Sequence, residues 1–136
     1  MRSAGFFSSS RSIVWASHLV ILFPVWQGSL PAWSKGFLEQ VFRPEFAYGA
    51  ARQPRRFPRK LLGGRSARII ATVGMPGLLF RWYFHAHGLK SVQLSLLEFC
   101  GIKPVRTTLF GAVEAVSPAR RHDWLERVRE LGRLGV

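Results

Sequence analysis

Two short segments of the chain carry the residue types best suited to binding a flat ligand. Residues 24–28 (Pro-Val-Trp-Gln-Gly) offer the aromatic ring of Trp26 and a glycine, and residues 72–77 (Thr-Val-Gly-Met-Pro-Gly) offer two glycines. A planar heteroaromatic ligand suits this pairing, because the indole ring can stack on it while main-chain N–H groups donate hydrogen bonds to it. The alternative interpretation is that both segments, here called the first and the second loop, are ordinary turns with Trp26 half-buried.

The apolar pattern predicts three strands that alternate with three helices. Strands are expected at residues 19–23, 67–73 and 105–113, and helices at about residues 29–43, 88–100 and from 118 onward. Such alternation indicates βαβ units, and therefore an α/β fold whose parallel sheet is covered by helices on both faces. The first strand is continuously apolar, which is typical of a strand buried on both faces. Ser29 is expected to cap the first helix, and Trp33 and Phe37 to lie in the core.

Both loops then follow the carboxyl ends of parallel strands. These ends lie at one edge of the sheet, and open α/β sheets bind their ligands in the crevice beyond that edge. The sequence therefore predicts that two loops distant in the chain meet at one binding site.

Length and composition are those of one domain with a packed core. The chain has 136 residues, 48% of them apolar, which is enough for a core in a single domain. Residues 1–13 are rich in serine and predict a flexible start, so the domain is expected to span residues 14–136.

The longest apolar run is too short and too polar for a membrane span, and no clean signal-peptide cleavage site follows it, which favours a cytoplasmic protein. The one cysteine, Cys100, excludes an internal disulfide and a cysteine-based zinc site, and is expected to be a buried thiol.

Much of the net charge of +13 lies in residues 52–68, which run from the connection after the first helix into the second strand. The cations crowded there are Arg52, Arg55, Arg56, Arg59, Lys60, Arg65 and Arg68. With Phe57 among them, they could bind nucleic acid or another acidic partner. No motif of a known nucleic-acid-binding fold accompanies them, so a solvated basic loop is the competing interpretation. His85 and His87 lack a carboxylate partner, so we expect no metal site there.

Several motifs occur in an order and spacing that match one family. Residues 18–48 run from an apolar strand through Pro-Val-Trp-Gln-Gly-Ser-Leu-Pro-Ala and Lys-Gly-Phe to Val-Phe-Arg-Pro-Glu-Phe-Ala-Tyr. Further motifs are Leu-Leu-Gly-Gly-Arg-Ser-Ala-Arg at 61–68, Thr-Val-Gly-Met-Pro at 72–76, Arg-Trp-Tyr-Phe at 81–84 and Phe-Cys-Gly-Ile-Lys-Pro-Val at 99–105. Together with the last helix, they resemble the flavodoxin-like NAD(P)H:quinone oxidoreductases over about residues 14–133.

This resemblance implies a flavodoxin-like three-layer sandwich that binds FMN or FAD non-covalently, takes hydride from NAD(P)H and passes two electrons to a quinone. It also implies a homodimer. The cofactor-binding residues would be Pro24, Val25, Trp26, Gln27 and Gly28 against the flavin ring, and Thr72, Val73, Gly74 and Met75 at its pyrimidine end. Catalytic assistance would come from Tyr83 and His87, with His85 as a competing choice.

The resemblance does not include the N-terminal part of the family. Family members begin with a strand, a phosphate-binding loop, a helix and a second strand, and nothing before Leu19 matches these. We therefore expect a sheet truncated to about three strands, with an exposed edge that is open to pairing. Beside a quinone reductase impaired by truncation, two alternatives stay open: a non-catalytic flavodoxin-like interaction or regulatory protein, and a basic nucleic-acid-binding module.

Overall fold

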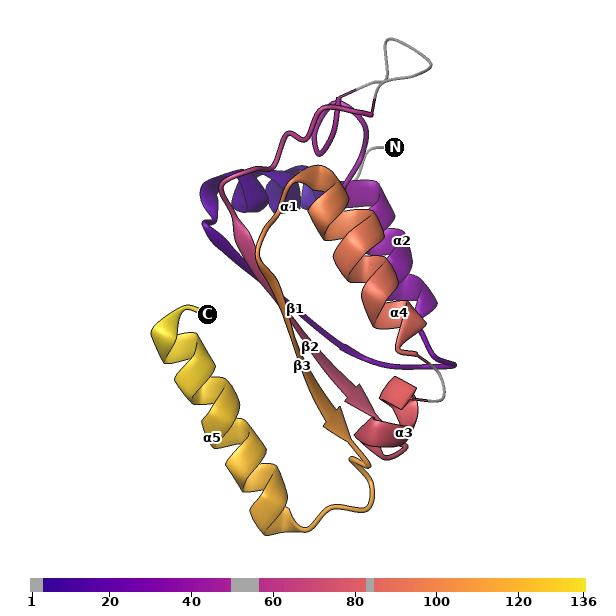
Figure 1. Cartoon of the computed structure of the whole chain (residues 1–136). Helices are drawn as coiled ribbons and strands as arrows, with labels where there is room; N and C mark the ends of the chain where they lie inside the picture. The colour runs from indigo at the N-terminus through magenta and orange to yellow at the C-terminus, as the bar shows by residue number, and fades with distance from the viewer. Residues whose placement is uncertain (1–3, 50–56, 83–84) are drawn as a thin grey trace.

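The computed structural model of the chain describes residues 4–49, 57–82 and 85–136. Three parallel strands, in the order β1-β2-β3, lie between two layers of helices (Figure 1). The strands are β1 (His18–Pro24), β2 (Ser66–Val73) and β3 (Val105–Gly111). The predicted α/β fold, its three strands and their parallel arrangement are confirmed.

Helices fill the connections on both faces of the sheet. They are α1 (Ala4–Trp15), α2 (Ala32–Val41), α3 (Gly77–Trp82), α4 (His87–Lys90), which continues directly into η1 (Ser91–Glu98), and α5 (Pro118–Leu134). α5 lies on one face, and α1, α2 and the α4–η1 helix lie on the other (Figure 1). Within the described residues, no helix combines the length and the apolar character needed to cross a membrane.

The core lies between the sheet and the layer that contains α2, α4 and η1. Alternate residues of β2 from Ala67 to Val73 are buried on this face, because the side chains of a strand alternate between its two sides. They belong to one apolar cluster with Leu38 and Val41 of α2 and Leu97 of η1. The first and second loops therefore leave strands that are anchored to this cluster.

β1 is an edge strand, so the prediction that it is buried on both faces is wrong. Phe23 is buried in the core, but Val20 is 58% exposed and Leu22 is 69% exposed. The reason is the position of α5, which packs against the opposite edge of the sheet, where the rings of Phe110 and Trp124 lie 4.9 Å apart. A continuously apolar sequence does not reveal which strand of a parallel sheet lies at the edge.

Residues Ala4–Trp15 form helix α1, where the serine-rich sequence predicted a start without regular structure. A long-range contact holds the end of this helix. The Arg65 guanidinium donates from Nε to the carbonyl of Ile13 (3.0 Å) and from Nη2 to that of Val14 (2.8 Å). Such a contact leaves no periodic signal in the local sequence.

α2 begins without the predicted serine cap. Pro31 occupies the capping position and its side chain makes no hydrogen bond, whereas the N–H of Ser29 donates to the carbonyl of Trp26 (3.0 Å). The prediction that Trp33 and Phe37 are core residues is also wrong, since Trp33 is 82% exposed and Phe37 is 44% exposed. Both lie on the part of the apolar stripe that extends past β1, where the described chain has no further strand to cover them.

The basic residues between positions 52 and 68 do not form one surface. Arg68 lies within β2 and is buried, and its Nη1 donates to Oγ1 of Thr108 (2.7 Å). Arg65 is engaged with the end of α1. Arg52, Arg55 and Arg56 lie outside the described residues. Two of the seven cations thus hold the fold together instead of facing a partner.

His18 gives the fold a dependence on pH. Its Nδ1 lies 2.7 Å from Oγ of Ser66, and its buried Nε2 has no hydrogen-bond partner in the described structure. Burial lowers the pKa of His18, and the charges of Arg68 and Arg106 lower it further. The unfolded chain therefore binds a proton at His18 more readily than the folded chain, so the free energy of unfolding falls as the pH drops below about 6.5.

We expect the variant His18→Gln to lose part of this dependence between about pH 7 and 5, the range in which histidine titrates. The measurement is the free energy of unfolding by urea at a series of pH values. His122→Gln, on the exposed surface of α5, is the control and should keep the slope of the parent chain. Equal slopes for the parent chain and His18→Gln would contradict the assignment.

Cys100 is the buried thiol that the sequence predicts, with 1% of its surface exposed. Burial raises the pKa of this thiol to about 11, although the charge of Lys60 acts in the opposite direction. Because the thiolate is the reactive form, we expect iodoacetamide to modify the folded chain at least ~10-fold more slowly than the urea-unfolded chain at equal pH. Mass spectrometry of timed samples measures both rates, and equal rates would show that Cys100 is accessible in the fold.

Candidate functional site

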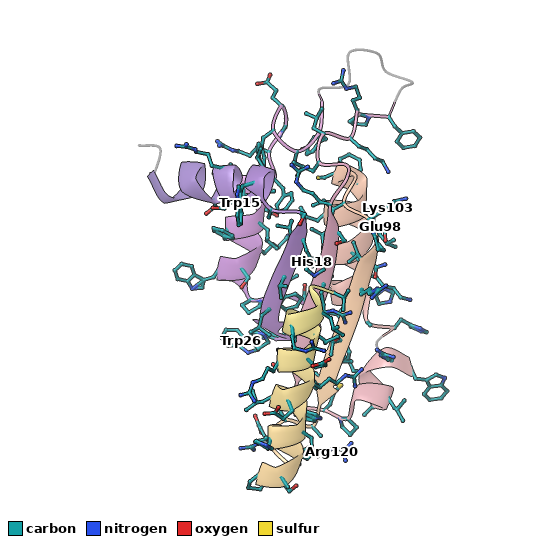
Figure 2. The ribbon with its side chains drawn as sticks, turned by 90° about the vertical axis from the view of Figure 1, so that its left-hand side faces the viewer. Trp15, His18, Trp26, Glu98, Lys103 and Arg120 are labelled. Atoms are coloured by element: carbon teal, nitrogen blue, oxygen red, sulfur yellow. The ribbon has the colours of Figure 1, made fainter. Side chains whose placement is uncertain are left out.

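A cavity of about 1090 Å³ opens where β1 and β2 end. Both loops line it, the first with Pro24, Val25, Trp26 and Gln27, and the second with Thr72, Val73 and Gly74. Figure 2 shows Trp26 at the carboxyl end of β1. The two loops thus meet at one cavity, as the parallel arrangement of their strands predicts.

The first loop is a tight turn fixed by its own backbone. The N–H of Trp26 donates to the carbonyl of Ser29 (2.9 Å), and the N–H of Ser29 donates to the carbonyl of Trp26 (3.0 Å). Between them, Gln27 and Gly28 both have positive φ, 50° and 81°, as the two central residues of a type I′ turn require. This turn holds Trp26 at the cavity with 62% of its surface exposed.

The second loop is held by the end of β3. The N–H of Ala112 donates to the carbonyl of Met75 (2.8 Å). Gly77 packs directly on Gly111, so closely that a Cβ added to Gly111 would lie 2.2 Å from the nitrogen of Gly77. The absence of a side chain at Gly111 therefore allows β3 to support the second loop.

The two loops are joined to each other and still leave hydrogen-bond donors free. The N–H of Val25 donates to the carbonyl of Thr72 (2.7 Å). In the part of the chain that the structure describes, the N–H groups of Gln27 and Gly74 have no acceptor, and both residues are exposed at the cavity. These two N–H groups are available to a ligand.

A third segment lines the cavity and is absent from the sequence-based prediction. It consists of Val113 and Glu114, which follow β3. From α2, Lys35 adds a cation whose Nζ lies 3.5 Å from Oε1 of Glu39. The rule that placed the first two loops at the carboxyl edge of the sheet applies equally to the third strand, so Val113 and Glu114 could have been found from the sequence.

Two predicted cofactor-binding residues shape the loops without lining the cavity. The carbonyl of Gly28 faces Gly88 at the start of α4, where a Cβ on Gly88 would lie 2.3 Å from that oxygen and 2.7 Å from Cα of Ser29. Met75 is partly buried against the core and its carbonyl accepts the hydrogen bond from the segment after β3. Gly28 and Met75 therefore position the walls of the cavity through their backbones.

The predicted catalytic residues are placed only in part. Tyr83 lies outside the described residues. His85 and His87 are exposed, and their rings meet edge to face with centroids 5.6 Å apart. His87 directly precedes Gly88 and so lies beside the first loop, but neither histidine is among the residues that line the cavity. Among the described residues, no three potential metal ligands gather in one place.

Comparison with known proteins identifies the family. A family model described as a flavodoxin-like fold matches residues 8–131, and the chain belongs to this family. The crystal structure of the protein Smu.1420 from Streptococcus mutans shares 30% sequence identity with a TM-score of 0.83, over 97% of this chain and 68% of its own. No curated protein matches the chain.

Two further solved structures share the fold at lower sequence identity. An NAD(P)H:quinone oxidoreductase from Methanothermobacter marburgensis is 22% identical with a TM-score of 0.74, over 96% of this chain and 64% of its own. An FMN-dependent NADH-azoreductase from Bacillus anthracis, solved in complex with FMN, is 16% identical with a TM-score of 0.71, over 97% of this chain and 64% of its own. The chain thus spans about two thirds of the length of these three proteins.

Proposed function

We propose that this protein is a flavin-dependent oxidoreductase that transfers a hydride from NAD(P)H, through non-covalently bound FMN or FAD, to a quinone. The observation that carries the proposal is the meeting of both loops at one cavity, with an exposed indole and free backbone donors in its wall. The names of solved relatives support it, because one is an NAD(P)H:quinone oxidoreductase and another an FMN-dependent NADH-azoreductase.

The residues at the cavity fit the ring system of a flavin. A flat heteroaromatic ring needs an apolar face to lie on and donors along its polar edge, and the wall offers Trp26 together with the N–H groups of Gln27 and Gly74. The volume of about 1090 Å³ is slightly larger than the ~300–1,000 Å³ that small-molecule sites usually occupy. It therefore leaves room for a nicotinamide or quinone ring beside the flavin.

A bound flavin supplies the centre that accepts and donates the hydride, and the chain's own residues would orient it. The Trp26 indole would contact the ring face. The N–H groups of Gln27 and Gly74 are fixed in direction by the backbone around them, so they would stabilise negative charge at the ring edge without a cost in reorganisation. We further propose that His87, beside the first loop, and Tyr83 assist at the substrate side.

Trp26→Ala tests the proposal. Because stacking of a base on an aromatic side chain is worth about 1–3 kcal/mol, we expect the Kd for FMN to rise at least ~5-fold, and NAD(P)H oxidation in the presence of a quinone to fall by a similar factor at limiting FMN. The measurements are quenching of flavin fluorescence and the absorbance of NAD(P)H.

Trp15→Ala is the matched control, since Trp15 is 89% exposed on α1 and does not line the cavity; it should keep the affinity and rate of the parent chain. Flavin binding without NAD(P)H oxidation would indicate a non-catalytic flavoprotein. No flavin binding by the parent chain would refute the proposal.

A further inference from the structure

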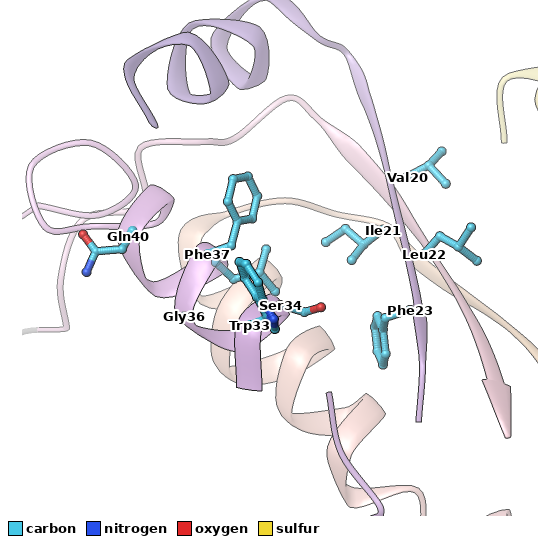
Figure 3. A pocket seen from close by; sticks show the side chains of 10 residues that line it. Val20, Ile21, Leu22, Phe23, Trp33, Ser34, Gly36, Phe37 and Gln40 are labelled. Carbon is cyan, nitrogen blue, oxygen red and sulfur yellow. The ribbon is translucent and has the colours of Figure 1, made fainter. Parts of the chain in front are cut away.

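One cavity of the described structure concentrates positive charge. It has a volume of about 600 Å³ and is lined by residues of α3, β3 and α5. Arg81 of α3 and Arg120 and Arg127 of α5 belong to this lining, which contains no aspartate or glutamate. By contrast, the groove between β1 and α2 is lined only by uncharged residues (Figure 3). The cavity with the three arginines, here called the cationic cavity, therefore has the charge needed to attract an anion.

The two arginines from α5 belong to one face of that helix. Arg120, Trp124 and Arg127 are spaced by four and then three residues, the spacing at which side chains are neighbours on a helix surface. All three line the cationic cavity, and Figure 2 shows Arg120 near the start of α5. The indole of Trp124 packs on Phe110 of β3, with ring centroids 4.9 Å apart. The α5 wall of the cavity thus carries an aromatic ring with a cation one turn away on each side.

No carboxylate among the described residues neutralises the three arginines of the cationic cavity. The carboxylates of α5 that form ion pairs with arginine are Glu126, with Arg129, and Glu130, with Arg133, and none of these four residues lines the cavity. Asp123 lies one turn from both Arg120 and Arg127 but forms an ion pair with neither. Like charges that share a cavity repel each other, so an anion bound between them would be stabilised.

The cationic cavity is separate from the candidate flavin site. The two cavities share no lining residue. The second loop contributes to both, because residues 72–74 line the flavin cavity whereas Pro76 and Gly77 line the cationic one. The segment after β3 is divided in the same way, with Ala112 at the cationic cavity and Glu114 at the flavin cavity. A ligand in the cationic cavity can therefore bind without displacing a flavin ring.

We infer that the cationic cavity binds a nucleoside polyphosphate, with its phosphates on Arg81, Arg120 and Arg127 and its base against Trp124. A guanidinium group presents N–H donors in a planar fork that matches the oxygens of a phosphate. The three arginines are exposed and Trp124 is partly exposed, so both parts of the ligand can reach their partners. The volume of about 600 Å³ lies within the ~300–1,000 Å³ of small-molecule sites, which favours a single nucleotide over a nucleic-acid strand.

The test is a calorimetric titration of the full chain with ATP, with and without FMN. We expect saturable binding of one ATP per chain, which FMN does not displace. Arg120→Gln with Arg127→Gln should raise the Kd for ATP at least ~10-fold, because two charged donors to phosphate are lost. The matched control is Arg129→Gln with Arg133→Gln, which removes the same charge from the same helix outside the cavity; it should change the Kd less than ~2-fold.

A variant on another element tests the site even if the double variant of α5 fails to fold. Arg81→Gln, on α3, should raise the Kd for ATP at least ~5-fold. Inorganic tripolyphosphate lacks the base that stacks on Trp124, so it should bind the parent chain at least ~5-fold more weakly than ATP.

Five outcomes would each overturn the inference. They are no binding of ATP, equal weakening by the two double variants, displacement of ATP by FMN, tripolyphosphate that binds as tightly as ATP, and a single-stranded oligonucleotide that binds more tightly than ATP through the same arginines. Because ATP is titrated without flavin as well, the result does not depend on whether the chain binds flavin.

Discussion

Gly88→Ala is expected to disrupt the first loop and with it the flavin site. A Cβ at Gly88 would lie 2.3 Å from the carbonyl oxygen of Gly28 and 2.7 Å from Cα of Ser29, and both neighbours are backbone atoms that cannot rotate away. The turn must therefore move, and overpacking of this kind costs about 1–3 kcal/mol of stability. A displacement of about 1 Å at a site costs roughly 100-fold in rate, so we expect a loss of that size in flavin-dependent NAD(P)H oxidation.

Gly132→Ala is the control for Gly88→Ala. A Cβ at Gly132 meets no atom within 4 Å, and alanine in the interior of a helix is about 1 kcal/mol more favourable than glycine. This variant should match or exceed the parent chain in melting temperature and keep its FMN affinity. Gly88→Ala with unchanged FMN affinity would mean that the first loop does not form the site.

Gly111→Ala is expected to act on the second loop in the same way. The added Cβ would lie 2.2 Å from the nitrogen of Gly77, 2.7 Å from its Cα and 3.1 Å from the carbonyl oxygen of Met75. The second loop must separate from the end of β3, so we expect a loss of about 1–3 kcal/mol in the free energy of unfolding. FMN affinity should fall at least ~10-fold, since each 1.4 kcal/mol of lost binding energy is a factor of ten.

The control for Gly111→Ala is Gly63→Ala, in the connection before β2, where an added Cβ meets no atom within 4 Å. Urea denaturation and FMN titration of both variants give the two required quantities. If Gly111→Ala keeps the FMN affinity of the parent chain, the second loop is not part of the cofactor site, whatever its effect on stability.

The order of strands and helices could be predicted because it depends on local patterns. Residues 67–73 (Ala-Arg-Ile-Ile-Ala-Thr-Val) are rich in β-branched side chains, and the helix after Ser117 begins with a recognisable cap, whose hydroxyl oxygen accepts from the N–H of Arg120 (3.3 Å). The convergence of the first and second loops followed from the parallel topology alone. These features need no knowledge of which strand is central.

The position of a residue relative to distant elements could not be predicted. Leu22 belongs to the apolar run that predicts β1, but its exposure depends on α5 lying over the opposite edge of the sheet. Arg68 belongs to a run of cations in the sequence, yet its place in β2 buries it beside Thr108. Gly88 reads as an ordinary helix start, and only the fold brings it against Gly28.

A titration of the purified chain with FMN and with FAD, followed by quenching of flavin fluorescence and by a shift of the visible absorption bands, is the decisive experiment. We expect saturable binding of one flavin per chain, weakened by Trp26→Ala and retained by Trp15→Ala. Binding that is absent, or that Trp26→Ala leaves unchanged, would show that the cavity between the two loops is not a flavin site.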